Sequence, residues 1–86
     1  MRPPLTRRTN RVIRNAILLA LSEKKRSIHE IANSASVNWR TTELHLTFLK
    51  GKEYVVEVFR HHQLRIFELT ESGKKFLQKS NGKRKK

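Results

Sequence analysis

The chain has 86 residues, a formal net charge of +13 and no cysteine. A chain of this length builds one small domain, and without cysteine it has neither a disulfide nor a thiolate metal site to stabilise it. Its longest apolar run, residues 16–21, is too short to cross a bilayer and is followed by no small-residue cleavage site. We therefore expect a cytoplasmic protein with no signal peptide and no membrane partner.

The positive charge is concentrated at the two ends of the chain. Residues 1–14 hold five arginines and residues 74–86 hold seven lysines or arginines, and neither stretch contains an acidic residue. Residues 15–73 hold eight bases and all seven acids, so the ends carry +12 and the middle only +1. Basic ends of this kind neutralise phosphates and release counterions, which favours nucleic acid as the partner. Tails that only aid solubility are the alternative.

Three segments are expected along the chain. Residues 1–8, with two prolines and three arginines, form a flexible basic arm. Residues 9–80 form the globular domain. Residues 81–86 form a basic tail that is too polar to fold by itself.

The first helix runs to about Ser22, and Thr6 or Thr9 can cap its start. Its apolar residues leave only a narrow polar stripe, which is more apolar surface than one side of a surface helix needs. This helix is therefore either sandwiched within the fold or also a homodimer interface. The candidate interface residues are Ile17, Leu18 and Leu21.

Two shorter helices follow. Ser27 caps a helix from 28 to about 34, and Glu30 three residues later completes a capping box. Asn38 then caps a helix that runs to about Lys50, with Gly51 as its stop signal.

The last part of the domain combines a hairpin with a helix. Residues 54–59 and 64–69 are rich in β-branched and aromatic residues, and the polar link between them is short, which predicts a β-hairpin. Thr70 caps a final helix, residues 71–80. This helix is expected to bury two residues, Phe76 and Leu77.

This order of elements predicts an α+β, mostly α, winged helix-turn-helix fold: three helices, a two-stranded β-hairpin wing and a short C-terminal helix. In such a unit the second helix of the helix-turn-helix lies in the major groove of DNA. The hairpin that follows can reach the flanking backbone or the minor groove.

Three stretches carry a family resemblance, namely AILLALSE, SIHEIANSASVNWRTTELHLTFLKGKEYVV and FELTESGKKFL. In them the chain resembles small archaeal winged-helix proteins that are predicted transcription regulators, related to the ten-kilodalton chromatin-associated winged-helix proteins of Sulfolobus. The resemblance implies duplex DNA binding and often a homodimer. The chromatin-type relatives dimerise through a long last helix with a coiled-coil seam, which a helix of about ten residues without heptads does not support. Glu53 stands where the family usually has glycine, and Gly51 lies two residues earlier, so the end of the third helix stays open.

One side of the third helix is expected to read bases. Arg40 can grip guanine O6 and N7 with its planar fork. Glu43 can accept from a cytosine amino group or pair with Arg40 on the same face. Trp39 can contact a thymine methyl group or the sugar-phosphate chain, or it can pack on the preceding helix. The candidate base-reading residues are Trp39, Arg40, Glu43 and Thr47, whereas His45 falls on the core side as a half-buried hydrogen-bonding histidine.

A second set of residues is expected at the DNA backbone. The hairpin tip suits phosphate contact, although a solvated tip is the alternative, and basic side chains before the first helix could enter a minor groove. Ser27 could offer its hydroxyl and free helix-start amides to a phosphate. The candidates are Arg7, Arg8, Arg11, Ser27, Asn38, Lys50, Arg60, His61, His62 and Arg65.

Adjacent strand residues point to opposite faces, so His61 and His62 are not expected to bind one metal ion. With three glycines, no cysteine and no aspartate, the chain also lacks a phosphate loop and an acid pair for catalysis. No enzyme activity, cofactor or small-molecule substrate is therefore expected. The prediction is a nucleoid-associated double-stranded DNA-binding protein, either a transcription regulator or a chromatin-type architectural protein. The alternatives are an RNA-binding or ribosome-associated protein and a protein-interaction module of the transcription machinery.

Overall fold

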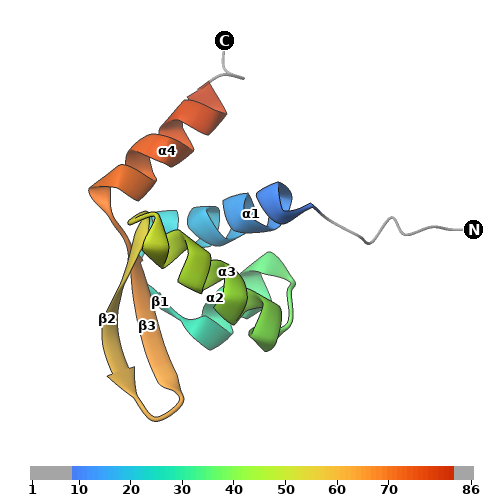
Figure 1. Cartoon of the computed structure of the whole chain (residues 1–86), viewed down its shortest axis with the longest axis vertical. Coiled ribbons are helices and arrows are strands. Elements are labelled where there is room, and N and C mark those ends of the chain that lie inside the picture. The colour runs from blue at the N-terminus through green and yellow to red at the C-terminus, as the bar shows by residue number, and fades with distance from the viewer. Residues whose placement is uncertain (1–8, 83–86) are drawn as a thin grey trace, which may run out of the picture.

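The computed structural model describes residues 9–82 and contains four helices and one three-stranded antiparallel sheet (Figure 1). This confirms the predicted fold class. The expected arm at residues 1–8 and residues 83–86 of the expected tail lie outside the described residues. The elements are α1 (Asn10–Glu23), β1 (Arg26–Ser27), α2 (Ile28–Ala35), α3 (Trp39–Gly51), β2 (Val55–His61), β3 (Leu64–Leu69) and α4 (Glu71–Gly82).

The sheet has the order β1-β3-β2, so the hairpin strand β3 is its centre. The hairpin β2–β3 was expected, but β1 was not: its two residues pair with Phe67 and Ile66 of β3. The hairpin extends away from the helical body, at the lower left of Figure 1. Because β1 leads directly into α2, this short pairing joins the hairpin to the helix-turn-helix.

Each helix begins after a side chain that accepts a hydrogen bond from an amide of its first turn, as predicted. These bonds satisfy backbone donors that have no partner within the helix. At α2 the capping box is complete, because the Glu30 carboxylate also accepts from the amide of Ser27 at 3.0 Å. The capping contacts are Val12 N to Thr9 Oγ1 at 3.2 Å, Glu30 N to Ser27 Oγ at 3.2 Å, Thr41 N to Asn38 Oδ1 at 2.8 Å and Gly73 N to Thr70 Oγ1 at 3.0 Å.

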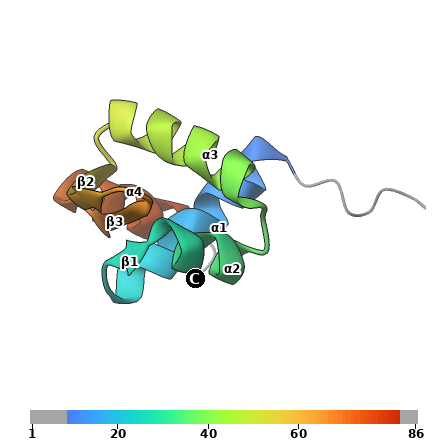
Figure 2. The ribbon, with the colours of Figure 1, turned by 90° about the horizontal axis from the view of Figure 1, so that it is seen from below.

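Helix α1 is sandwiched within the fold. It packs against α2, α3, α4 and β3, and Figure 2 shows it in the middle of the molecule with α3 along one outer side. The proposed dimer interface through Ile17, Leu18 and Leu21 is therefore wrong, because these side chains are at most 2% exposed in a single chain. The exposed apolar residues of this helix are Val12 and Leu19.

The buried core draws on every helix and on both hairpin strands. Burying such side chains contributes roughly 1.5–3 kcal/mol each, which is what holds a domain of this size together. The core residues are Ile17, Leu18, Leu21, Ile28, Ile31, Ala35, Leu46, Leu49, Val55, Phe67, Leu69 and Leu77.

The end of α3 differs from the prediction. Gly51 is not a stop signal but the last residue of the helix, and the left-handed residue is Glu53, with φ of 66°. A side chain in this conformation is uncommon and must be fixed by its surroundings. Two hydrogen bonds fix it: the Glu53 amide donates to the Lys50 carbonyl at 2.9 Å, and the Glu53 carbonyl accepts from the Thr70 hydroxyl at 2.6 Å.

Helix α4 continues to Gly82, two residues beyond the predicted end. Leu77 is buried as expected, but the predicted burial of Phe76 is wrong, since Phe76 is 40% exposed. Neighbouring residues on a helix point about 100° apart, so only one of the two can face α1. Phe76 instead stacks on Tyr54, with ring centroids 4.6 Å apart. Between residues 9 and 82, no helix has the length and apolar character needed to cross a membrane.

Candidate nucleic-acid interface

Helices α2 and α3 form a helix-turn-helix whose second helix lies at the surface. The turn closes at Ser36, a left-handed residue whose amide bonds back to carbonyls of α2. Helix α3 runs along an outer side of the molecule, over α1 and beside the hairpin (Figure 2). This arrangement leaves one side of α3 accessible along its length.

The predicted division of α3 into two faces is largely correct. Thr42, His45, Leu46 and Leu49 are buried, whereas Trp39 and Arg40 are exposed. Phe48 is 39% exposed, so the accessible side of α3 extends to this residue. Leu44 is 66% exposed and extends the accessible side further. Thr47 is also exposed, and its hydroxyl donates to the Glu43 carbonyl at 3.0 Å.

Glu43 forms an ion pair, but not with the expected partner. Its carboxylate binds Arg65 of β3, with Arg65 Nη1 and Glu43 Oε2 3.0 Å apart, rather than Arg40 on its own helix. The contact joins the middle of α3 to the hairpin. Arg40 is exposed on the first turn of α3.

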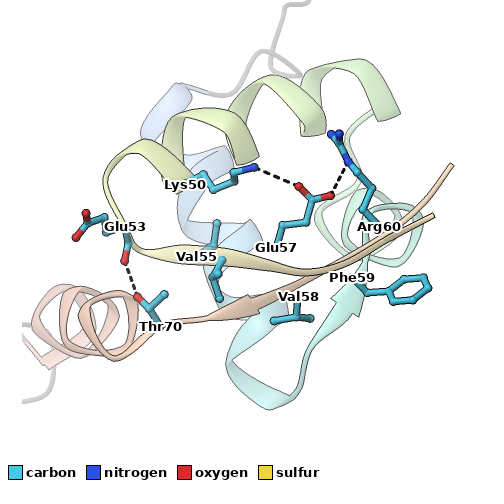
Figure 3. A pocket seen from close by; sticks show the side chains of 9 residues that line it. Lys50, Glu53, Val55, Glu57, Val58, Phe59, Arg60 and Thr70 are labelled. Carbon is cyan, nitrogen blue, oxygen red and sulfur yellow. Dashed lines mark hydrogen bonds and ion pairs between the residues drawn. The ribbon is translucent and has the colours of Figure 1, made fainter. Parts of the chain in front are cut away.

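A cluster of five charged residues joins α3 to the hairpin, and Glu57 of β2 lies at its centre. Its carboxylate accepts from Arg65 Nε at 2.9 Å, Lys50 Nζ at 3.2 Å and Arg60 Nε at 3.3 Å. Figure 3 shows Lys50 and Arg60 reaching Glu57 from opposite sides. We call Glu43, Lys50, Glu57, Arg60 and Arg65 the wing–helix cluster.

The hydrogen bond from Arg65 is the main cause that lowers the pKa of Glu57 to about 2, so the carboxylate stays charged at neutral pH. The same contact raises the pKa of Arg65. Both side chains are only 11% exposed. Arg65, expected at the DNA backbone, is thus enclosed between two carboxylates, those of Glu57 and Glu43.

A break in strand register directs the wing side chains. The pairing shifts between Glu57 and Phe59, which is the mark of a β-bulge. As a result Glu57 and Arg60 both point toward α3, while Val58 and Phe59 point away from it (Figure 3). Glu57 is not among the site residues predicted from the sequence. The signal was its place two residues after Val55, on the inward side of an alternating strand.

An open groove runs between α3 and the hairpin tip. Three predicted backbone residues of the tip, Arg60, His61 and His62, line this groove together with Trp39 of α3. The remaining residues that line it are Glu43, Gln63 and Arg65. The groove thus joins both predicted sets of contacts on one surface.

His61 and His62 do not point to opposite faces, as had been predicted. β2 ends at His61, and His62 lies in the turn with φ of 55°, so the two rings meet edge to face with centroids 4.1 Å apart. Alternation holds only within a strand. Among residues 9–82, no group of three His, Cys, Asp or Glu side chains could hold a metal ion.

His45 is 7% exposed and accepts a hydrogen bond from Arg14 Nε at Nδ1, 3.1 Å away, which confirms its predicted core role. Burial lowers the pKa of His45, and the charge of Arg14 lowers this pKa further. The Arg14 guanidinium also lies 3.6 Å from the centre of the Phe48 ring. This contact covers part of the exposed Phe48.

The other predicted backbone residues fall into three groups. Ser27 and Asn38 use their side chains to cap α2 and α3, and the Ser27 amide donates to Glu30, as the capping box predicts. Arg11 is exposed on α1. Arg7 and Arg8 lie outside the described residues.

Comparisons with known proteins identify the fold. A family described as winged helix-turn-helix matches residues 7–86. The structure is similar to the transcriptional regulator BldR of Sulfolobus solfataricus, at 26% identity and a TM-score of 0.74, over 81% of this chain and 52% of that one. It is also similar to MepR, a transcription regulator of a Staphylococcus aureus multidrug efflux pump, at 18% identity and 0.72, over 81% and 54%. A homodimeric winged helix-turn-helix DNA-binding domain from Mycobacterium bovis matches at 21% identity and 0.70, over 80% and 64%.

The chain spans about half the length of the first two of these proteins. A sequence search among curated proteins gives no match. The link to the chromatin-associated winged-helix proteins of Sulfolobus stays a resemblance in sequence.

Proposed function

Because the chain belongs to the winged helix-turn-helix family, we propose that it binds double-stranded DNA as a transcription regulator. In this proposal α3 lies in the major groove and the hairpin lies along the flanking backbone. The observation that supports it is the accessible side of α3, which shares one open groove with the hairpin tip.

Arg40 is the residue we propose as the principal base reader. It is exposed on the first turn of α3, where a recognition helix presents its side chains to base edges. Trp39 precedes it, 37% exposed, with its ring centroid 6.3 Å from that of His29 on α2. This position suits contact with a thymine methyl group or a sugar next to the base that Arg40 reads.

Backbone contacts are assigned to cations that reach solvent. Lys50 and Arg60 have side chains that are 44% and 63% exposed, on either side of the wing–helix cluster. Arg65 is enclosed, so its proposed role is to hold the hairpin against α3. Arg7, Arg8 and Arg11 are proposed to contact phosphates beside the main site.

Substitution of Arg40 by Ala tests the proposal. A lost base contact weakens binding by roughly 1–3 kcal/mol on duplexes that contain the preferred base and much less on others. Lys25→Ala is the matched control, since it removes one charge from the exposed connector between α1 and β1. Binding is measured by fluorescence anisotropy on duplexes selected from a random pool. An equal loss of affinity on every duplex would show that Arg40 contacts a phosphate and not a base.

Whether the chain acts as a regulator or as a chromatin-type protein depends on how much of its DNA affinity comes from phosphate contacts. With one arginine on the accessible side of α3 and most charge at the chain ends, we propose phosphate-dominated binding with modest sequence preference. Removing residues 1–8 and 83–86 leaves every described element intact and should make the salt dependence of binding much shallower. An unchanged salt dependence would refute a role for the ends. Competition with structured RNA at fixed salt tests whether duplex DNA is the preferred partner.

A homodimer is also proposed, since one similar domain is homodimeric. Its interface has to use residues other than the buried set of α1. Val12 and Leu19, 48% and 44% exposed, are the apolar residues of α1 that remain accessible. Sedimentation of the wild type and of Leu19→Glu tests this: the wild type should sediment as a dimer and the variant as a monomer.

A further inference from the structure

Two of the cations assigned to phosphate contact are already bound to an anion of the chain itself. Lys50 Nζ lies 3.2 Å from Oε1 of Glu57, and Arg60 Nε lies 3.3 Å from Oε2. Each carboxylate oxygen therefore neutralises one solvent-accessible cation. A DNA phosphate offers the same chemistry, two anionic oxygens that accept from lysine and arginine.

The carboxylate is held in place independently of these two cations. Glu57 is 11% exposed, and Arg65, equally enclosed, donates to it at 2.9 Å. Arg65 is anchored in turn by Glu43 of α3 at 3.0 Å. The carboxylate is thus a fixed group at the base of the wing, whereas Lys50 and Arg60 can turn outward.

We propose that Glu57 limits the affinity for DNA, because its carboxylate competes with DNA phosphates for Lys50 and Arg60. The inference rests on the proposed DNA binding and deepens it. Every duplex, whatever its sequence, must displace Glu57 before it gains these two phosphate contacts. Contacts from α3 to bases do not involve this carboxylate, so the competition lowers the affinity for every duplex by a similar factor and acts on the phosphate contacts alone.

The wing keeps its place when the charge of Glu57 is removed. Arg65 still pairs with Glu43, and β2 still pairs with β3 along its length. The stacking of the hairpin on the core through Val55 and Phe67 is unaffected, because both are buried apolar residues. Neutralising Glu57 therefore releases two cations without detaching the hairpin.

The test compares Glu57→Gln with Glu68→Gln. Both changes remove one negative charge, but Glu68 is exposed and pairs with Val56 across the hairpin ladder, on the opposite face from Glu57. Binding to a duplex of random sequence is measured by fluorescence anisotropy over a series of salt concentrations. Glu57→Gln should bind about fivefold more tightly than Glu68→Gln, because DNA no longer has to break two weak ion pairs. Its log–log salt slope should be steeper by about one to two, one increment per freed cation.

A third variant identifies the released cation. Arg60→Gln should weaken binding less than twofold in the wild type, because Arg60 is already neutralised there, and clearly more in the Glu57→Gln background. If circular dichroism shows that Glu57→Gln does not fold, the test is the DNA affinity of the single variant Arg60→Gln. A loss of affinity of about tenfold relative to the wild type overturns the inference.

The outcomes separate this inference from the proposed function. If the wild type shows no affinity for duplex DNA, the proposed function fails. If the wild type binds but Glu57→Gln binds no more tightly than Glu68→Gln, only the role of Glu57 is overturned.

Discussion

Gly73 occupies a point at which α4 has no room for a side chain. A Cβ there would lie 2.1 Å from the Tyr54 carbonyl oxygen and 2.8 Å from Cδ1 of Leu69. The Tyr54 oxygen cannot move aside, because it accepts from the amide of Thr70 at 3.0 Å. Gly73→Ala must therefore push α4 away from the start of β2 by more than 1 Å, since an ordinary contact needs at least 3.4 Å.

The cost of this displacement follows from the contacts that α4 gives up. The cap from Thr70 to the Gly73 amide is worth about 1 kcal/mol. Partial loss of Leu77 from the core adds about 2 kcal/mol, and loss of the Tyr54–Phe76 stack adds about 0.5–1.5 kcal/mol. We expect Gly73→Ala to lower the free energy of unfolding by about 3.5–4.5 kcal/mol.

The assay is urea unfolding followed by circular dichroism, with Gly51→Ala as the matched control. Gly51 has no atom within 4 Å of its would-be Cβ and a helical backbone, so alanine there should stabilise the chain by about 0.5–1 kcal/mol. The free energy of unfolding should therefore fall in Gly73→Ala and rise in Gly51→Ala. A Gly73→Ala variant within 1 kcal/mol of the wild type would refute the packing of α4 described above.

Two further predictions concern pH. Burial and Arg14 lower the pKa of His45, so the folded state favours the neutral ring, and the free energy of unfolding should fall as pH drops below about 6.5 toward the lowered pKa. His45→Gln should flatten this dependence between pH 7 and 5 in urea unfolding, and a slope that persists in the variant would contradict it. The pKa of Glu57 is lowered from 4.5 to about 2, so its pairing stabilises the fold above pH 4.5 and is lost toward pH 2. Glu57→Gln should therefore be less stable than the wild type at pH 7, by at most about 3 kcal/mol, and the difference should shrink in acid; a constant difference would show that its cationic partners do not lower the pKa of Glu57.

The features that could be predicted from the sequence depend on residues that lie only a few positions apart in the chain. A cap joins residues three apart, so Ser27, Asn38 and Thr70 could be assigned from local spacing alone. The two faces of α3 followed from helical periodicity in the same way. The candidate base-reading face could therefore be predicted from the sequence, although its contacts with DNA stay a proposal.

The features that were missed depend on how distant elements dock. β1 has two residues and exists only because Phe67 and Ile66 lie beside it. Arg65 reaches Glu43 across 22 residues of sequence, so local spacing pointed to Arg40 instead. Glu53 takes a left-handed backbone at a position that usually selects glycine, because the Thr70 hydroxyl fixes its carbonyl.

The apolar surface of α1 was the main source of error about assembly. Sequence alone left burial and dimerisation as equal explanations for it. The structure places α2, α3, α4 and β3 around this helix, which accounts for its apolar residues within one chain. A helix at the centre of a small domain is apolar on most sides for the same reason that core helices of larger proteins are.

Amide chemical-shift mapping on addition of a duplex tests the central claim most directly. If α3 and the hairpin tip form the DNA-binding surface, the largest shifts should fall on Trp39, Arg40, Thr47 and residues 60–63. Shifts confined to α1, α4 and the chain ends, with the exposed side of α3 unchanged, would contradict the claim.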